Sequence, residues 1–269
     1  MDSKTSKTAL AKKLCVSRSS LYYCSKMKIR DTALKEQILA PLSEHPSYGH
    51  KRLAMHLGRN KKCILRVMKK YDIKPYRRRI RRPRKNGDLN NDPLCIANYA
   101  KDICPLARNV LWASDFTYFW HRGKWWYLCT ILDIFSREVI GVSFSGKHDK
   151  ELILGALQDA LSKYPAPKFL HSDQGSEYRS YAYFDLLKSH GIQASFSKKS
   201  SPWQNGYQES FYSEFKKDLG DVSRFETLAE FMEGLYLQIY YYNNLRIHTA
   251  LKMPPVLFKQ HSTLACKVS

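Results

Sequence analysis

VLWASDFTYFWHRGKWWYLCTILDIFSREVIGVSFS, residues 110–145, is the stretch that decides the fold. Two runs rich in aromatic and β-branched residues, 110–120 and 124–135, are separated by His121-Arg122-Gly123, which is typical of a hairpin turn. A third run, 138–145, follows a second short turn. Strand-forming residues interrupted only by short turns favour antiparallel pairing. The stretch therefore predicts three consecutive antiparallel strands.

The chain beyond this stretch alternates between helical and strand patterns. Asp149 is a suitable N-cap for a helix whose apolar residues recur at helical spacing, and Pro165 and Pro167 end it. The elements expected next are a strand at 168–172, a helix near 180–190, a strand at 192–196, a helix that starts after Pro202, and a last helix from about Thr227 to Tyr242. A turn-rich segment closes the chain. This order predicts a layered α/β domain at residues 109–220.

Three acidic residues, Asp115, Asp173 and Glu209, stand in these otherwise apolar elements, and 35 residues separate the last two. A carboxylate is costly to bury unless it is paired or binds a cation. Mg²⁺ prefers oxygen ligands, and two such ions can activate a hydroxyl and neutralise charge at phosphorus in phosphodiester chemistry. We therefore expect a two-metal site in which Asp115 bridges both ions, Asp173 binds one and Glu209 binds the other.

Each of these acids also has a structural explanation when it is taken alone. Asp173 precedes Gln174-Gly175 and is of a type that caps turns. Glu209 lies on a predicted helix, where a solvent-exposed charge is the ordinary case. Asp115 is the hardest to explain structurally, because it lies inside an apolar and aromatic run. The combination of the three, rather than any one of them, predicts the site.

Positive charge is concentrated in the first 108 residues. This part holds 27 Lys or Arg against 8 Asp or Glu, whereas residues 109–269 hold 18 against 16. Such asymmetry is typical of a nucleic-acid-binding arm joined to a nearly neutral body. The alternative is a solvated basic segment without a specific partner.

No apolar run approaches the roughly 20 residues that span a bilayer, and the N-terminus lacks the apolar core of a signal peptide. The seven cysteines form no CxxC pair, which argues against a zinc knuckle. We therefore expect a reducing, cytoplasmic setting and no membrane partner.

Residues 45–74 predict two helices, the second with a basic outer face. The first runs from about Lys51 to His56 and stops at Gly58, and Asn60 can cap the second. The inner apolar stripe of the second helix consists of Ile64, Leu65 and Met68. Its basic face is offset from that stripe and faces outward, and it consists of Lys62, Arg66 and Lys69. This suits a helix that contacts DNA, although the solvated face of a small bundle has the same pattern. Residues 8–23 carry a weaker pattern, which is also that of an ordinary helical hairpin.

Residues 74–85 contain eight Lys or Arg in twelve positions, with two prolines and no apolar periodicity. We expect an extended linker that follows DNA phosphates, with contacts from Arg77, Arg78, Arg79, Arg81 and Arg82. The expected division of the chain is a short helical segment at 1–30, a helix-turn-helix DNA-binding segment at 31–75, a basic linker at 76–108, a catalytic core at 109–220, and a helix and tail packed on the core at 221–269.

Several stretches of the chain resemble one known family. They are WASDFTYF, LDIFSREVIGVSFS, HSDQGSEY, SPWQNGYQESFYSEFKKDL and YYNNLRIHTALKMPPVLF, with HPSYGHKRLAMHL and RVMKKYDIKP ahead of them. In co-linear order from roughly residue 31 to 260, they look like the second-frame (orfB) transposases of bacterial insertion sequences, whose DDE catalytic core is retroviral-integrase-like. The resemblance implies an α/β, RNase H-like core preceded by small all-α helix-turn-helix segments.

The resemblance also implies DNA transposition by metal-dependent 3′-end cleavage and strand transfer, without a covalent protein–DNA intermediate. By motif position, Asp115, Asp173 and Glu209 take the catalytic and metal-binding roles, with two Mg²⁺ or Mn²⁺ ions per site when DNA is bound. Lys216, two helical turns beyond Glu209, resembles a basic residue that holds terminal DNA, although a solvated lysine fits its position equally.

The implied partners are double-stranded DNA, as terminal repeats and as target, and further copies of the chain on that DNA. Many two-frame elements fuse this frame to an upstream protein with a leucine zipper. No heptad seam is visible here, so we expect either an upstream-frame partner or end recognition by the chain's own N-terminal helices. The implied location is the bacterial cytoplasm, at the nucleoid.

Two alternatives stay open at this point. One is a non-catalytic DNA-binding architectural or repressor protein derived from a transposase, against which the intact acidic trio argues. The other is a structure-selective RNase H-like nuclease, which would hydrolyse DNA with water and join nothing.

Overall fold

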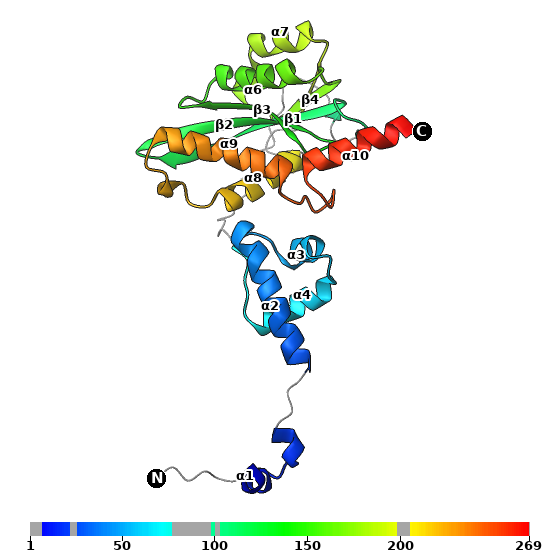
Figure 1. The fold of residues 1–269 in the computed structure, drawn as a ribbon. Helices are drawn as coiled ribbons and strands as arrows, with labels where there is room; N and C mark the ends of the chain where they lie inside the picture. Colours follow the sequence, from blue (N-terminus) through cyan, green and yellow to red (C-terminus); the bar gives the residue numbers. More distant parts are fainter. Residues whose placement is uncertain (1–6, 22–25, 77–97, 100–102, 198–204, 269) are drawn as a thin grey trace, which may run out of the picture. The chain divides into compact units, whose positions relative to one another are not determined.

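The computed structural model describes residues 7–21, 26–76, 98–99, 103–197 and 205–268 (Figure 1). The chain divides into two compact units, Met1–Pro75 and Tyr76–Ser269, each with its own buried apolar residues. Within the described ranges, no helix is long and apolar enough to cross a membrane.

The first unit is a small helical body. Its elements are α1 (Lys7–Lys13), the 3₁₀ helix η1 (Arg18–Leu21), α2 (Lys26–Glu44), α3 (His50–His56) and α4 (Lys61–Lys70). The helices α2, α3 and α4 pack together, and Ile38, Leu53 and Ile64, one from each, are fully buried between them. The two helices predicted within residues 45–74 are thereby confirmed and are α3 and α4.

Local signals explain where α3 ends and α4 begins. Gly58 has a φ of +58°, a conformation that favours glycine, and it follows α3. The Asn60 side chain then accepts a hydrogen bond from the backbone N–H of Lys62 at 2.8 Å, which confirms it as the N-cap. The buried stripe of α4 differs slightly from the predicted one and consists of Ile64, Val67 and Met68, with Leu65 only partly buried.

The second unit is built on one five-stranded sheet. Its strands are β1 (Leu111–His121), β2 (Lys124–Asp133), β3 (Val139–Ser145), β4 (Phe169–Ser172) and β5 (Gln193–Phe196), in the spatial order β3-β2-β1-β4-β5. The first three pair antiparallel, whereas β4 pairs parallel with β1 and β5 parallel with β4. This order confirms the predicted three-strand meander and the RNase H-like topology that the resemblance implies.

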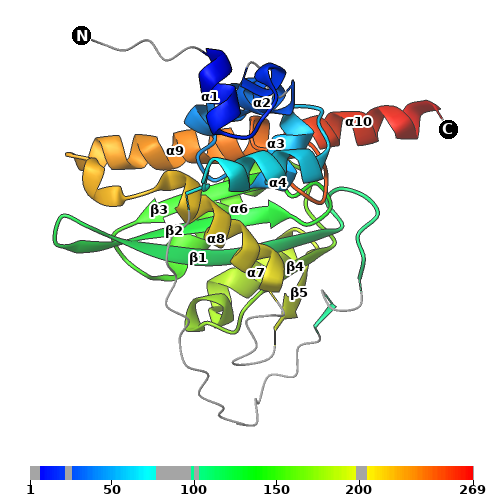
Figure 2. The ribbon, with the colours of Figure 1, turned by 90° about the horizontal axis from the view of Figure 1, so that it is seen from below.

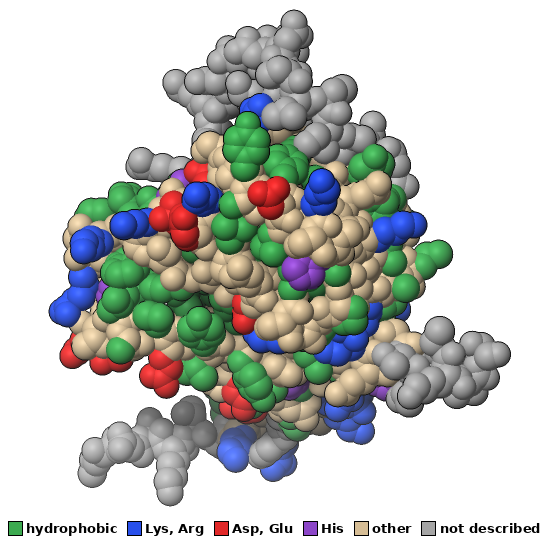
Figure 3. Space-filling view, turned by 90° about the horizontal axis from the view of Figure 1, so that it is seen from above, with side chains coloured by type: hydrophobic (Ala, Val, Ile, Leu, Met, Phe, Trp, Pro, Cys, Tyr) green, Lys and Arg blue, Asp and Glu red, His purple; other side chains and the backbone are tan. Residues whose placement is uncertain are grey.

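Helices cover both faces of this sheet (Figures 1 and 2). One face carries α6 (Lys150–Lys163) and α7 (Tyr181–Ser189), and the other carries α8 (Gly206–Leu219), α9 (Leu228–Asn244) and then α10 (Pro255–Val268). Asp149 caps α6 as predicted, because its side chain accepts from the backbone N–H of Leu152. Figure 3 looks onto the α6 and α7 side, where acidic and basic side chains are interspersed over the surface.

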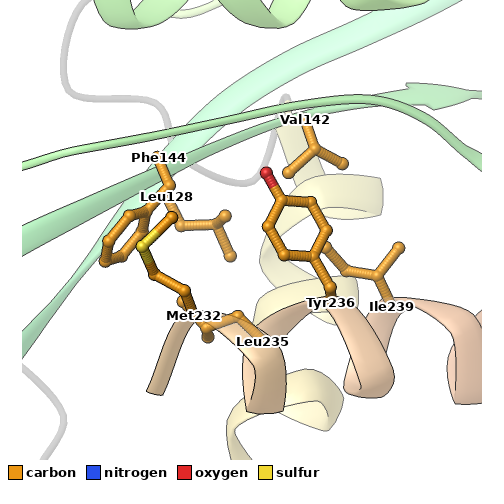
Figure 4. A pocket seen from close by; sticks show the side chains of 7 residues that line it. All are labelled: Leu128, Val142, Phe144, Met232, Leu235, Tyr236 and Ile239. Carbon is orange, nitrogen blue, oxygen red and sulfur yellow. The ribbon is translucent and has the colours of Figure 1, made fainter. Parts of the chain in front are cut away.

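The α9 helix packs on the sheet through an apolar seam (Figure 4). The side chains that line this seam are Leu128, Val142, Phe144, Met232, Leu235, Tyr236 and Ile239. The inner face of α9 consists of Phe231, Leu235, Ile239 and Tyr242, which are all buried.

Two helices lie where the sequence predicted none. The 19-residue α2 contains Pro41, and its apolar residues are weakly segregated to one face, so neither signal of a helix is strong. The closing segment, predicted as turn-rich, instead forms α10 from Pro255 onward. Proline is well suited to the first position of a helix, because its missing N–H has no helical partner there in any case.

Candidate active site

Asp115 and Asp173 belong to neighbouring parallel strands. The β1–β4 ladder ends with the pair Ala113 and His171, and each aspartate lies two residues further along its chain. Because side chains alternate between the faces of a strand, continuing the ladder by that interval directs both carboxylates to the same side. Asp173 lies in the turn after β4, where its Oδ1 accepts from the backbone N–H of Gly175 at 3.1 Å. The strand register thus brings the two predicted aspartates together.

Polar side chains on the first turns of α8 fix that helix to the sheet. Gln208 is fully buried, and its Nε2 donates to the carbonyl oxygens of Ala113 at 2.6 Å and Thr130 at 3.1 Å. One turn later, the Tyr212 hydroxyl donates to the carbonyl oxygen of Asp115 at 2.7 Å. The helix is therefore anchored to the strand segment that carries the first predicted acid. The sequence predicts the helix but not these contacts.

Glu209 lies on this anchored part of α8. It follows Gln208 directly, and its own side chain is exposed. Immediately before the helix, the buried Asn205 donates from Nδ2 to the carbonyl oxygen of Ser114 at 3.3 Å. Hydrogen bonds from Asn205, Gln208 and Tyr212 therefore fix the part of α8 that holds Glu209 to the β1 backbone at residues 113–115.

The electrostatics show that Asp173 and Glu209 both act on Asp115. The pKa of Asp115 is raised to about 7, first because the carboxyl is buried and next because Asp173 is negatively charged; Glu209 adds a smaller upward effect. The backbone N–H of Phe116, at 2.9 Å, and the Lys216 ammonium lower it in part. Burial also raises the pKa of Asp173. A cation among these carboxylates would stabilise their charged forms.

The donors at this place suit a hard divalent cation, which prefers carboxylate oxygens. The raised pKa of Asp115 is in keeping with that chemistry, since a buried carboxylate is stabilised by a bound cation. As the side chains stand, no three His, Cys, Asp or Glu among the described residues form a group that could hold a metal ion. The arrangement brings Asp173 and Glu209 within electrostatic range of Asp115.

A fourth carboxylate, which the sequence did not predict, lies beside Asp173. A Cβ placed on Gly175 would lie 2.8 Å from Glu177 Oε2 and 3.2 Å from Asp173 Oδ1, so the two carboxylates flank one small gap. Glu177 Oε1 is 3.2 Å from His148 Nδ1, and the His148 ring packs against that of Phe116 with centroids 4.1 Å apart. The only sequence signal for this neighbour is the short spacing within HSDQGSEY, because the turn folds Glu177 back toward Asp173.

Trp112 on β1, His171 on β4 and Tyr178 in the turn at 176–179 lie close to the acids in the sequence and are buried. Their contacts are Trp112 Nε1 to Asn109 Oδ1 at 3.2 Å, the Tyr178 hydroxyl with Ser114 Oγ at 2.8 Å, and His171 Nδ1 with Ser195 Oγ at 2.9 Å. All three side chains are almost fully buried, which fits a role in supporting the strands rather than in contacting a substrate.

The three DNA-contacting residues predicted on α4 have different surroundings. Lys62 and Lys69 are exposed. Arg66 is half-exposed, but its guanidinium donates to both carboxylate oxygens of Asp31, at 2.6 and 2.8 Å, and Lys70 Nζ donates to the same carboxylate at 2.7 Å. These bonds hold the pKa of Asp31 down at about 2. Arg66 therefore has a structural ion pair that the outward-facing pattern did not predict.

Lys216 and the basic linker complete the predicted contacts. Lys216 Nζ donates to the carbonyl oxygen of Tyr118 at 3.2 Å and lies over the Tyr118 ring, 5.3 Å from its centroid. The five linker residues predicted to follow phosphates lie outside the described residues, and they are Arg77, Arg78, Arg79, Arg81 and Arg82.

Comparison with known families and proteins gives consistent matches. The family described as integrase core domain matches residues 105–202, and a second family of that description matches residues 190–255. A transposase for the insertion sequence element IS904 of Lactococcus lactis is 32% identical over 238 residues, covering 84% of this chain and 93% of the relative. The transposase InsF for IS3A of Escherichia coli is 37% identical over 118 residues, covering 43% of this chain and 41% of the relative.

Among solved structures, the HTLV-2 integrase catalytic core domain in complex with magnesium has a TM-score of 0.47 and 19% sequence identity. That match covers 57% of this chain and 97% of the integrase chain.

Proposed function

Because the chain belongs to the integrase-core transposases of bacterial insertion sequences, we propose that it cleaves the 3′ ends of an element and joins them to target DNA. The observation that supports this most directly is the raised pKa of Asp115, to which burial and the charges of Asp173 and Glu209 contribute. The three acids come from the interior of β1, the turn after β4 and the first turn of α8. The proposed catalytic and metal-binding residues are these three. Their donor chemistry fits phosphodiester transfer assisted by divalent metal ions.

The proposed site uses its protein groups mainly for positioning. Asp115, Asp173 and Glu209 would hold two Mg²⁺ or Mn²⁺ ions, which when bound supply an activated hydroxyl and charge neutralisation at phosphorus. The backbone N–H of Gly175 orients the Asp173 carboxylate, and the N–H of Phe116 does the same for Asp115. Anchoring of α8 keeps the Glu209 backbone at a fixed distance from β1. The reaction needs no covalent bond between protein and DNA.

We assign DNA binding to the basic first part of the chain. The proposed helix-turn-helix segment at 31–75 would contact an element end through Lys62 and Lys69 on α4, whose side chains are exposed. Arg66, held by Asp31, would present the remainder of its guanidinium to phosphate. The linker at 76–108 would follow the phosphate backbone without reading sequence.

The proposed assembly is a homo-oligomer bound to double-stranded DNA. This DNA comprises the terminal repeats of the element and the target. An upstream-frame protein is a further proposed partner, and the bacterial cytoplasm, at the nucleoid, is the proposed location. These proposals rest on membership of the family, whose reactions join two DNA molecules.

A matched set of variants tests the catalytic proposal. Asp115→Asn, Asp173→Asn and Glu209→Gln each remove one carboxylate at constant size, while Asp185→Asn and Glu233→Gln do the same at exposed positions on α7 and α9. The substrate is a duplex that ends in the terminal sequence of the element, incubated with target DNA and Mg²⁺. We expect the first three variants to lose nicking and joining while they retain DNA binding, and the two controls to keep both activities.

The same assay separates the alternatives. Normal strand transfer by any one of the three site variants would remove that residue from the catalytic set. DNA binding without any Mg²⁺-dependent product from the wild-type chain would favour a non-catalytic DNA-binding protein. Hydrolysed but never joined products would favour a nuclease.

A further inference from the structure

The β1–β2 hairpin carries three large aromatic side chains that are only half-buried. Tyr118, Trp120 and Trp125 are 55%, 52% and 47% exposed. The Trp125 ring meets the other two edge to face, with centroids 5.2 Å from Tyr118 and 5.0 Å from Trp120. Clusters of exposed large apolar side chains mark binding surfaces more often than single ones do. The β1–β2 hairpin extends beyond the rest of the sheet (Figure 2).

The aromatic cluster lines a groove of about 790 Å³ in the second unit. Lys216 and the turn at 220–222 also line this groove. Lys216 Nζ is close to the aromatic wall, because it lies 5.3 Å from the centroid of Tyr118 and 5.0 Å from that of Phe119. The groove therefore combines aromatic ring surface with a positive charge.

The local charge favours a polyanion as the occupant. Residues 116–132 include Arg122 and Lys124, both exposed, and no Asp or Glu. The acid that does line the groove, Asp221, accepts a hydrogen bond from the backbone N–H of Ser223 at 3.0 Å and caps the following turn. Aromatic residues alternating with cations are the usual surface for unpaired nucleic acid, on which bases stack and phosphates pair with Lys or Arg.

The position of the groove fits a DNA strand that leaves the proposed active site. Tyr118 and Trp120 lie three and five residues beyond Asp115 on β1, about 10 and 16 Å away at roughly 3.3 Å per residue, and these odd intervals place their side chains on the opposite face of the strand. The β1–β4 ladder ends at Ala113, and Lys216 Nζ reaches β1 beyond that point, where it donates to the carbonyl oxygen of Tyr118 at 3.2 Å. Lys216 lies two turns beyond Glu209 on α8, about 10 Å away at 1.5 Å per residue. At about 3.4 Å per nucleotide along one strand, these distances correspond to roughly three to five nucleotides.

We propose that this groove binds unpaired nucleotides of the element end, about three to five positions from the reacting phosphate. Bases stack on Trp120 and Trp125, while Lys216, Arg122 and Lys124 face the phosphates. This inference rests on the proposed function, because it takes the reacting phosphate to lie at Asp115. A surface of the same composition also suits a protein partner, so self-association is the rival outcome that the test must detect.

The test measures binding by the full-length chain without divalent metal, so that catalysis does not enter. Two duplexes of the element end are compared, one fully paired and one with its last five nucleotides unpaired and carrying a fluorescent base analogue. The variants are Trp120→Ala and Trp125→Ala, with Trp120→Phe as the conservative change. Tyr181→Ala is the control, because Tyr181 on α7 is 91% exposed and lies outside the groove.

We expect each Trp→Ala variant to bind the unpaired end roughly 5- to 150-fold more weakly, the range for loss of one base–aromatic stack. Binding to the paired end should change less than twofold, Trp120→Phe should restore most of the loss, and Tyr181→Ala should behave as wild type. The fluorescence of the base analogue should be quenched by wild-type protein and not by Trp120→Ala. Thermal melting and sedimentation of each variant accompany these measurements.

Equal affinity of wild type and both alanine variants for the unpaired end would overturn the proposal. An equal loss of affinity for both duplexes would also overturn it. So would variants that change only the sedimentation coefficient, because that result would assign the surface to contacts between copies of the chain. Failure of the proposed function has a different signature, in which the groove variants lose the unpaired end selectively but wild-type protein gives no Mg²⁺-dependent product.

Discussion

Gly175 is the position where a single methyl group tests the proposed site most sharply. Its φ of −55° and ψ of 150° suit alanine as well as glycine, so the backbone gives Gly175→Ala no reason to be strained. The new Cβ would lie 2.8 Å from Glu177 Oε2 and 3.2 Å from Asp173 Oδ1. To reach ordinary contact at about 3.4 Å, the two oxygens must retreat by about 0.6 and about 0.2 Å.

We expect the displacement of these oxygens to leave the stability of the fold nearly unchanged and to lower the rate of catalysis. Both oxygens are ends of side chains that can rotate, so we expect the free energy of unfolding to fall by less than about 1 kcal/mol. A misplacement of about 1 Å in an active site can cost about 100-fold in rate, so a shift of about 0.2 Å in the Asp173 carboxylate should cost roughly threefold. The loss should appear in the rate of strand transfer and not in the affinity for DNA.

The assay is single-turnover strand transfer at saturating DNA, alongside urea denaturation and DNA binding. The double variant Gly175→Ala/Glu177→Ala removes the closer of the two contacts and should recover part of the lost rate. Strand transfer by Gly175→Ala at the wild-type rate would contradict this prediction, because the crowding of Asp173 would then have no catalytic consequence. A rate loss that merely follows unfolding would refute it as well.

Three further predictions concern the rest of the molecule. Gln208→Ala should lower the free energy of unfolding by about 2–5 kcal/mol in urea titrations, because it leaves two buried carbonyl oxygens without their donor; a change under about 0.5 kcal/mol would contradict the anchoring of α8. The Asp31 carboxylate, whose pKa is lowered to about 2, should stabilise the first unit above about pH 4 and lose that effect as the pH falls toward 2; an NMR titration of Asp31 with an ordinary midpoint near 3.9 would contradict its ion pairs. Replacing the linker arginines with glutamine should weaken binding to all DNA sequences alike and reduce the slope of log K against log salt by about one per residue, and a loss confined to one sequence would oppose the linker assignment. The residues replaced are Arg77, Arg78, Arg79, Arg81 and Arg82.

Much of the fold could be predicted because its signals are local. The strand runs of 110–145 are bounded by short turns, and the caps at Asn60 and Asp149 are read directly from residue type and spacing. The two unpredicted helices lack such signals. In α2, Pro41 and weak apolar segregation hide the helix, and in α10 the first residue is a proline that also suits a turn.

The candidate site was only partly predictable, for a different reason. The acids were found by their motifs, and the strand register then brings Asp115 and Asp173 to neighbouring positions. The contacts of Gln208 join α8 to two strands and cannot be read from spacing. The same holds for the ion pair between Arg66 and Asp31, which are 35 positions apart, because an exposed basic pattern does not show what each charge meets.

The central claim is that Asp115, Asp173 and Glu209 together bind divalent metal ions. Calorimetric titration of Mn²⁺ into the full-length chain bound to element-end DNA, with a protein-free DNA blank, tests it directly. We expect two ions per site for wild type and for the Glu233→Gln control, and fewer than two for each of Asp115→Asn, Asp173→Asn and Glu209→Gln. An unchanged count of bound Mn²⁺ in these three variants would contradict it.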